Sequence, residues 1–229
     1  MSARLGRFVE TFRGSSFPTL AETTDGERLV IKMRGAGNGA GVLLAEFLVN
    51  RLASRCGLPV PDARVVEIAA GHPWEFGTDE FDDLLQKSAG PNQGLAWIPA
   101  ARQMREDEVL ALPEEMVSQI VTLDLAFANL DRTRDSGNLL LDPAGKCWIV
   151  DHGSCRFLYR EGKAFPKELP VGHVFRGREE LFDAGWLAGM TPELVEEVVG
   201  ELPDLWLREE GISREVVVGR VGDCLGMGR

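Results

Sequence analysis

The sequence predicts an α+β fold in which a strand-rich front part precedes a mostly helical back part. Three observations predict it. Short β-prone runs flank an Asp25-Gly26 dipeptide near the start of the chain. A second pair of short apolar runs, joined by a turn sequence, lies at residues 139–150. From residue 179 onward the chain shows helical patterns. These patterns favour two lobes, at residues 1–97 and 98–229.

Short strands are predicted in the front part. Residues Arg7–Phe12 are apolar enough to form one of them. Thr19–Glu22 and Arg28–Met33 flank Asp25-Gly26. An Asp-Gly pair between β-prone runs favours a tight turn with positive φ, so these two strands are predicted to form an antiparallel hairpin. Arg64–Ile68 is predicted to be another strand.

One long helix interrupts these strands. Val42–Cys56 carries leucine and phenylalanine residues at helical spacing, and the glycine at Gly57 is typical of a helix C-terminus. Residues 70–95 are expected to be irregular, apart from a short helix at Phe81–Lys87. A strand-like run at Leu95–Ile98 then ends at Pro99 and lies at the boundary between the two lobes.

The back part is predicted to be helical around one embedded hairpin. A helix is expected at Glu114–Asn129, where apolar residues share one face. Leu139–Leu141 and Cys147–Val150 are joined by Asp-Pro-Ala-Gly, which is a turn sequence, so these runs should pair as strands. Thr191 and Ser213 are candidate N-caps for helices in the tail.

The composition excludes several classes of protein. The 229 residues include 36 Asp and Glu against 25 Lys and Arg, a formal net charge of −11. A nucleic-acid-binding surface needs the opposite sign, so no nucleic-acid partner is expected. No apolar run approaches the roughly 20 residues of a membrane span, and the N-terminus lacks the apolar core of a signal peptide, so no membrane partner is expected. The cysteines are scattered, which favours reduced thiols in the cytoplasm: Cys56, Cys147, Cys155 and Cys224.

The densest group of polar residues surrounds the second hairpin. The helix leads into a loop that holds Asp131, Asn138 opens the first strand, and Asp151 follows the second. A hairpin holds Asn138 and Asp151 close together, and oxygen ligands of this kind suit Mg²⁺ bound with nucleotide phosphates. A further aspartate could orient an attacking hydroxyl in phosphoryl transfer. Each residue taken singly also fits an ordinary turn or cap.

The front lobe offers complementary positive charge. Lys32 lies in an apolar strand, and Glu46 follows in the next helix, so the pair could present an ammonium group to the α- and β-phosphates. A strand-end lysine on the solvent face is the alternative, since the alternation of a strand would permit it. The small residues Gly14, Ser15 and Ser16 join the first two strands, where their N–H groups could bind a phosphate or form a plain turn.

A glycine run supports a competing interpretation. Gly35, Gly37 and Ala40 match a loose dinucleotide-binding fingerprint between a strand and a helix, and Glu67 could bind a ribose. However, the preceding strand is one arm of a hairpin, whereas this fingerprint belongs to a parallel sheet. We therefore interpret the run as a connection into the helix that carries Glu46.

The order of these motifs resembles the HipA-like kinase domain, in its short bacterial branch. The resemblance covers about residues 10–160 and rests on these matching segments: the Gly-Ser-Ser loop, Val-Ile-Lys32, the helix with Glu46, Gly57-Leu-Pro-Val-Pro61, Asn129-Leu-Asp131-Arg132, Asn138-Leu-Leu-Leu and Ile-Val-Asp151-His-Gly153. The resemblance implies a bilobal, protein-kinase-like fold, distantly similar to phosphatidylinositol kinases. It also implies an ATP- and Mg²⁺-dependent kinase.

The resemblance also implies roles for single residues. Lys32 would contact ATP phosphates while held by Glu46, and Asp131 would be the catalytic aspartate. Asn138 and Asp151 would bind Mg²⁺. The remaining ATP-binding residues would be the loop at Gly14, Ser15 and Ser16, which is autophosphorylated in some HipA relatives, and two residues next to the hinge between the lobes, Trp97 and Ile98.

Some points stay open at the level of sequence. Residues 132–137 separate Asp131 from Asn138, a longer spacing than in protein kinases, so Asp135 could replace Asn138 as a ligand. The acceptor is expected to be a serine or threonine of a protein, although lipid and small-molecule acceptors remain open. A pseudokinase-like nucleotide-binding module is the main alternative, and a dinucleotide-binding protein is a further one.

Overall fold

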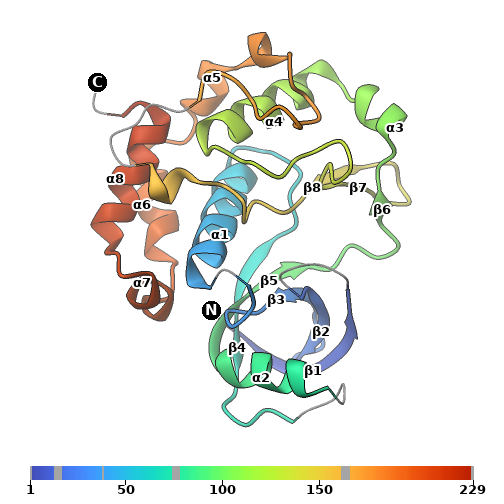
Figure 1. The fold of residues 1–229 in the computed structure, drawn as a ribbon, viewed down its shortest axis with the longest axis vertical. Coiled ribbons are helices and arrows are strands. Elements are labelled where there is room, and N and C mark those ends of the chain that lie inside the picture. The colour runs from blue at the N-terminus through green and yellow to red at the C-terminus, as the bar shows by residue number, and fades with distance from the viewer. Residues whose placement is uncertain (1, 13–16, 38, 74–77, 161–165, 228–229) are drawn as a thin grey trace.

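The structure is a computed structural model of the chain and describes residues 2–12, 17–37, 39–73, 78–160 and 166–227. Its fold is mixed α+β, as predicted. The front part forms a closed five-stranded barrel, drawn at the bottom of Figure 1. The back part is mostly helical and contains a small three-stranded sheet. Among the described residues, we find no helix with the length and apolar character to cross a membrane.

The barrel strands follow the order β1-β2-β3-β5-β4. Their bounds are β1 (Ala3–Thr11), β2 (Thr19–Thr23), β3 (Arg28–Lys32), β4 (Ala63–Ile68) and β5 (Gly90–Ala96). Neighbouring strands are antiparallel except β1 and β4, whose short parallel pairing closes the barrel. The predicted β2–β3 hairpin is confirmed, and Gly26 has the positive φ, 85°, that its turn requires.

The barrel differs from the prediction at its last strand. β5 begins at Gly90, within the segment expected to be irregular, and ends before Trp97. It pairs on one side with β3 and on the other with β4. These partners lie far away in the sequence, so tertiary pairing and not local propensity forms this strand. β3 is antiparallel to both of its neighbours, which does not fit the parallel unit of the dinucleotide-binding interpretation.

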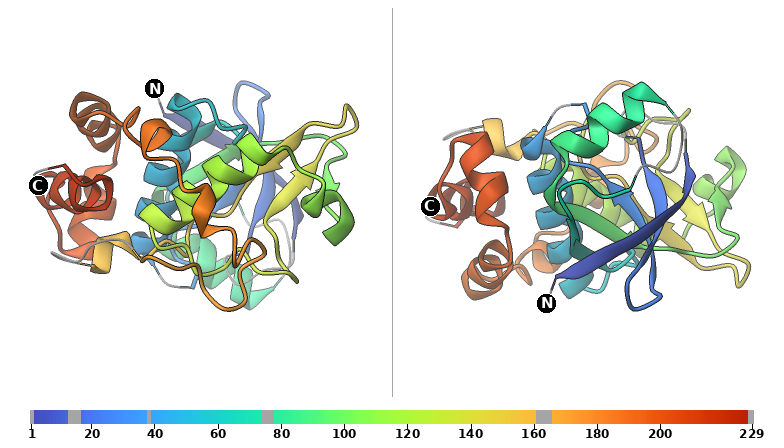
Figure 2. Two further views of the ribbon diagram at one scale, coloured as in Figure 1. Left: turned by 90° about the horizontal axis from the view of Figure 1, so that it is seen from above. Right: turned by 90° about the horizontal axis from the view of Figure 1, so that it is seen from below.

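Two helices accompany the barrel. α1 (Ala40–Arg55) is buried on nearly every side, because the barrel, the C-terminal helices and the core of the back part all contact it (Figures 1 and 2). It ends at Arg55, and Gly57, two residues beyond, has a φ of 85°, in line with the predicted glycine at the helix C-terminus. α2 (Asp79–Lys87) buries Phe81, Leu84 and Leu85 in the barrel core.

The back part contains helices in a continuous core with α1. They are α3 (Glu106–Leu110), α4 (Glu114–Ala126), α5 (Ala184–Leu187), α6 (Pro192–Gly200), α7 (Asp204–Glu210) and α8 (Arg214–Leu225), with 3-10 turns at Phe157–Tyr159 and Glu179–Leu181. The side chains of Thr191 and Ser213 cap α6 and α8, which confirms both predicted caps. α4 ends before the predicted Asn129, and Ala128 has a positive φ of 53° that a helix does not allow.

The small sheet contains the second predicted hairpin. Its strands are β6 (Arg102–Gln103), β7 (Leu139–Leu141) and β8 (Cys147–Ile149), and β7 pairs with β8 in antiparallel register. The carboxylate of Asp142 accepts hydrogen bonds from the backbone N–H groups of Ala144 and Lys146, which fixes the turn. β6 and α3 were not predicted.

Candidate functional site

A cleft of about 370 Å³ lies between the barrel and the small sheet. Most of its wall is apolar, and a lysine, an aspartate, an asparagine and a glutamine add polar groups to it. Its lining residues are Phe12, Pro18, Val30, Lys32, Pro61, Leu95, Ala96, Trp97, Ile98, Ala101, Gln103, Asn138, Leu140, Val150 and Asp151. An apolar cleft with a few convergent polar groups is the usual form of a small-molecule site.

Lys32 reaches the cleft because of the strand alternation in β3. Val30 and Lys32 line the cleft, whereas Leu29 and Ile31 point into the barrel core. The Lys32 ammonium donates to Glu46 Oε2 at 3.0 Å and to Asp151 Oδ1 at 2.7 Å. Glu46 is fully buried in α1. The two contacts of Lys32 therefore join the barrel to α1 and to the segment after β8.

Neighbouring charges set the protonation states of Lys32 and Asp151. Burial opposes the charged form of Lys32, but the carboxylates of Glu46 and Asp151 raise its pKa, so the amine stays protonated. Burial alone would raise the pKa of Asp151, yet the charge and hydrogen bond of Lys32 lower it. The site therefore holds a fixed ammonium group beside an ionised carboxylate.

The segment after β8 approaches α1 closely. Asp151 has a positive φ of 63°, and Gly153 lies against the helix. A Cβ at Gly153 would lie 2.7 Å from Val42 Cγ1 and 3.2 Å from Glu46 Oε2, so glycine permits this approach. His152 between them is fully buried, and burial lowers its pKa to about 3, so its ring is neutral.

Asp131 and Asn138 are brought together by a turn. Asn138 Nδ2 donates to the backbone oxygen of Asp131 at 3.3 Å, and Ser136 Oγ donates to Asn138 Oδ1 at 3.0 Å. Thr133 N donates to Ser136 O at 3.0 Å, so the additional residues of the long spacing form a compact turn. Asp135 is exposed and is absent from the cleft wall described above.

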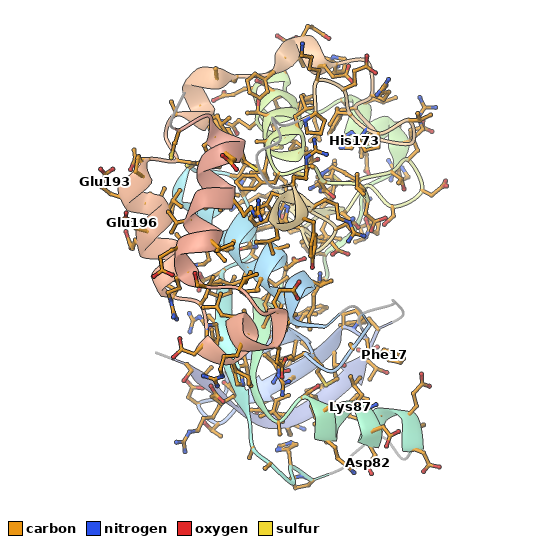
Figure 3. The ribbon with its side chains drawn as sticks, turned by 60° about the vertical axis from the view of Figure 1, so that its left-hand side comes forward. Phe17, Asp82, Lys87, His173, Glu193 and Glu196 are labelled. Atoms are coloured by element: carbon orange, nitrogen blue, oxygen red, sulfur yellow. The ribbon has the colours of Figure 1, made fainter. Side chains whose placement is uncertain are left out.

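A buried network that sequence reasoning missed holds this loop. Asp124 in α4 accepts hydrogen bonds from Arg132 Nε at 2.6 Å and from Asn129 Nδ2 at 2.8 Å, and it contacts His173 Nε2 at 3.0 Å. Asn129 Oδ1 accepts from the backbone N–H of Asp131. His173 belongs to the back part of the molecule (Figure 3). An aspartate inside an apolar helix, followed closely by an arginine, is the signal that could have revealed this pair.

Asp131 itself is exposed at the end of this network. Its partial burial and the nearby charge of Asp151 raise its pKa. A carboxylate with a raised pKa, held next to a second carboxylate and an amide, is suited to accept a proton from a hydroxyl group.

The cleft wall also includes both predicted residues next to the boundary between barrel and helices. Trp97 and Ile98 line it, and the Phe12 ring stacks on Trp97 with a centroid distance of 5.7 Å and an interplanar angle of 10°. The predicted phosphate-loop residues Gly14, Ser15 and Ser16 lie outside the described residues.

Asn138 and Asp151 carry oxygen atoms that could hold a metal ion in the cleft. Among the residues that the structure describes, no group of three or more His, Cys, Asp or Glu side chains could hold one. Mg²⁺ bound with a nucleotide takes one or two protein oxygen ligands beside phosphates and water. An amide oxygen and a carboxylate that both line the cleft supply that donor set.

Comparisons with known proteins agree with these observations. A family model described as HipA-like kinase matches residues 8–183. Among solved structures, the fold is similar to that of the Helicobacter pylori proinflammatory kinase CtkA, with a TM-score of 0.57 and 8% sequence identity, covering 96% of this chain and 98% of that one. A search of curated proteins finds no match.

Proposed function

Because this chain belongs to the HipA-like kinase family, we propose that it transfers the γ-phosphoryl group of ATP, with Mg²⁺, to a serine or threonine hydroxyl of a protein. We also propose that the barrel with α1 and the helical back part correspond to the two lobes of a protein-kinase-like fold, divided near residues 97 and 98. The cleft between them is then the nucleotide site.

One observation supports this proposal above the others. Lys32 contacts both Glu46 and Asp151, and Asp151 and Asn138 line the same cleft. These residues come from β3, α1 and both ends of the β7–β8 hairpin, which are distant in sequence. A purely structural role would not require a lysine, an asparagine and an aspartate to meet in the wall of a mostly apolar cleft.

The apolar and charged parts of the cleft suit different parts of a nucleotide. The apolar wall suits a purine base, with Val30 from the barrel on one side and Leu140 and Val150 from the hairpin on the other. Trp97 and Ile98 would contact the same base. Lys32 would contact the α- and β-phosphates, and its raised pKa keeps it cationic for this purpose.

Phosphoryl transfer then depends on positioning and charge. Asn138 and Asp151 would hold Mg²⁺, which neutralises charge on the phosphates when bound. Asp131 would accept a hydrogen bond from the acceptor hydroxyl. As the hydroxyl oxygen bonds to the γ-phosphorus, the bond from that phosphorus to the β,γ-bridging oxygen breaks, ADP leaves, and the proton passes to Asp131.

The test compares two aspartate variants. Asp131→Asn should lower kcat by about 10²–10⁴-fold, the usual contribution of a general base, and should leave ATP affinity nearly unchanged. Asp151→Ala should weaken Mg-ATP binding in titration calorimetry, because it removes a metal ligand. The acceptor is followed by mass spectrometry after incubation with labelled ATP. Full turnover in Asp131→Asn would remove this residue from the mechanism.

A nucleotide-binding module without transfer activity is the alternative that these experiments separate. Such a protein would bind Mg-ATP and lose affinity in Asp151→Ala, yet wild type and Asp131→Asn would both fail to label any protein, including the chain itself. A dinucleotide-binding protein would instead bind NAD and not ATP.

A further inference from the structure

α1 carries the buried carboxylate of the Lys32–Glu46 pair, and the C-terminal helices pack beside α1 (Figures 1 and 2). We propose that α7, through Trp206, positions α1 so that Glu46 stays on Lys32, and that Trp206 is therefore a positioning residue for phosphoryl transfer. This inference rests on the proposed kinase activity. It assigns a function to the C-terminal helices, which lie beyond the residues matched by the family model.

Trp206 joins α1, which carries Glu46, to β5, the strand that pairs with the β3 strand of Lys32. Its side chain is fully buried. The indole Nε1–H donates to Pro91 O in β5 at 2.9 Å, and the ring meets Phe47 of α1 edge to face, with centroids 5.9 Å apart. Phe47 follows Glu46 directly, and Pro91 lies two residues before Gln93, the β5 residue paired with Lys32. One side chain thus fixes the distance between strand and helix.

A second contact ties α7 to the barrel just beyond Lys32. Arg34 forms an ion pair with Glu209 in α7, and its Nη2 also donates to Ala89 O at 2.7 Å. The Arg34 side chain is mostly buried, with 12% exposure, so solvent screens this pair less than an open surface pair. α7 is therefore connected to the strand end that carries the lysine.

Further contacts hold α1 to the C-terminal helices. Arg51 donates to both carboxylate oxygens of Glu201, at 2.9 and 3.0 Å. At the other end of α1, the Glu210 carboxylate and the Tyr159 hydroxyl lie against Gly41, which has no side chain to displace them. A carboxylate beside the first turn of a helix also stabilises its positive end. Both ends of α1 are thus fixed by the C-terminal part of the chain.

A misplaced Glu46 is expected to lower the rate of phosphoryl transfer. A misplacement of about 1 Å at a catalytic group can lower the rate about 10²-fold. α1 has no N-terminal side-chain cap and no acidic residue in its first turn, so its own sequence supplies little of its end stabilisation. The contacts with α7 then contribute to holding Glu46 in place.

The main experiment is a double-mutant cycle on kcat. Trp206→Phe keeps an aromatic ring near Phe47 but removes the hydrogen bond to Pro91, and Trp206→Leu also removes the ring. We expect Trp206→Leu to lower kcat about tenfold, and Trp206→Phe less, in the wild-type background. In the Glu46→Gln background either change should lower kcat by less than about twofold, because the effect acts through Glu46. Equal factors in both backgrounds would overturn the proposal.

A matched pair of α7 variants separates positioning from loss of stability. Glu209→Gln removes the carboxylate that pairs with Arg34 on the barrel. Asp204→Asn removes a carboxylate whose ion-pair partner is Arg214 in α8, at 2.6 Å. This pair joins α7 to α8 and not to the barrel. We expect Glu209→Gln to lower kcat and Asp204→Asn to leave it unchanged, with similar small losses of stability. Equal kcat values in the two variants would contradict the proposal.

Hydrogen exchange tests the inference without any activity. In the ligand-free protein, Trp206→Phe should speed amide exchange in the first half of α1, around Leu43–Phe47, and leave α4 unchanged. Unaltered exchange in α1 would overturn the proposal even if the kinase is active. If the wild-type protein transfers no phosphoryl group but Trp206→Phe still speeds exchange in α1, the proposed function is refuted and the role of α7 in positioning α1 is retained.

Discussion

The carboxylate of Asp151 influences the proton affinity of the nearby Asp131. Asp131 and Asp151 come from opposite ends of the loop and hairpin, and the negative charge of Asp151 contributes to the raised pKa of Asp131, after the contribution of burial. In a kinase this arrangement would keep Asp131 a better proton acceptor than an ordinary aspartate.

Replacing Asp151 should therefore shift the titration of Asp131. In Asp151→Asn the like charge is absent, so the pKa of Asp131 should fall toward its ordinary value while burial still holds it above that value. The measurement is a ¹³C NMR titration of the Asp131 carboxyl group. Asp142 is the internal control, because a hydrogen bond from Trp148 lowers its pKa independently of the cleft. An Asp131 titration that does not move would exclude the proposed charge coupling.

Asp124 should matter for stability. Burial would raise its pKa, but Arg132 and His173 hold the pKa well below its usual range. Asp124→Asn would leave the buried Arg132 guanidinium without its counter-charge, a loss of about 3–5 kcal/mol in the free energy of unfolding. Urea unfolding of wild type and Asp124→Asn measures this loss in the free energy of unfolding. Because the folded-state pKa is lowered, this contribution is present above about pH 4 and declines as the pH falls below it.

A matched exposed pair provides the control for Asp124. Asp107 forms an ion pair with Arg105 in which both side chains are more than half exposed, so Asp107→Asn should change stability by less than about 1 kcal/mol. A loss at Asp124→Asn no larger than this would mean that the network does not stabilise the loop.

The sequence predicts part of the site because some residues stand out in their local sequence context. Lys32 is a charge in an apolar strand, and Asn138 and Asp151 bracket a recognisable hairpin. The contacts of Lys32 with Glu46 and Asp151 agree with that reasoning. Asp124 and His173 could not be paired in the same way, because they meet only through the folding of distant segments.

At the scale of elements, local turn chemistry explains what could be predicted. Both hairpins have turn sequences that fix their register, and both are confirmed. β5 has no such signal, since it begins with Gly-Pro and pairs with two strands from other parts of the chain. The closure of the barrel likewise depends on the parallel pairing of β1 with β4, which no local sequence pattern predicts.

Gly94 in β5 gives an element-scale prediction. A Cβ there would lie 2.7 Å from Val66 Cγ2 and 3.0 Å from Leu29 Cδ1, inside the barrel. Gly94→Ala should therefore lower the free energy of unfolding by about 1–3 kcal/mol through overpacking. Gly219→Ala is the matched control, because Gly219 lies in α8 with no atom within 4 Å of an added Cβ. It should stabilise the protein by up to about 1 kcal/mol, from helix propensity. Thermal unfolding distinguishes the two, and equal shifts would contradict the packing argument.

At the scale of the whole molecule, one hydrophobic cluster crosses the proposed boundary between lobes. It includes Ala63 and Leu95 from the barrel, together with α1, α4 and the C-terminal helices. Part of the acidic excess lies on the outer surface of α6, where Glu193 and Glu196 point outward (Figure 3). Net charge of −11 is thus compatible with an anionic ligand, since the cleft has its own ammonium group.

Ligand binding should therefore stabilise the whole chain. ATP with Mg²⁺ at 100 times its Kd should add about 2.7 kcal/mol, which corresponds to a rise in Tm of roughly 5–10 °C for a chain of this size. ATP without Mg²⁺ should give a smaller rise, and NAD none. The measurement is a thermal-shift assay with Asp151→Ala as the control variant. A rise with NAD alone would favour a dinucleotide-binding protein over a kinase.

The closed barrel also limits how this protein can associate with others. An open sheet leaves unpaired N–H and C=O groups along its outer strands, and partner peptides or other copies of a chain can add a strand there. Here β1 pairs with β4 at Ala3–Arg4 and Val66–Glu67, so the two strands that would be outermost face each other. Recognition by strand addition is thereby disfavoured at this junction. Partners that approach the barrel there must bind through side chains, which ties their recognition to surface residues and not to backbone hydrogen bonding.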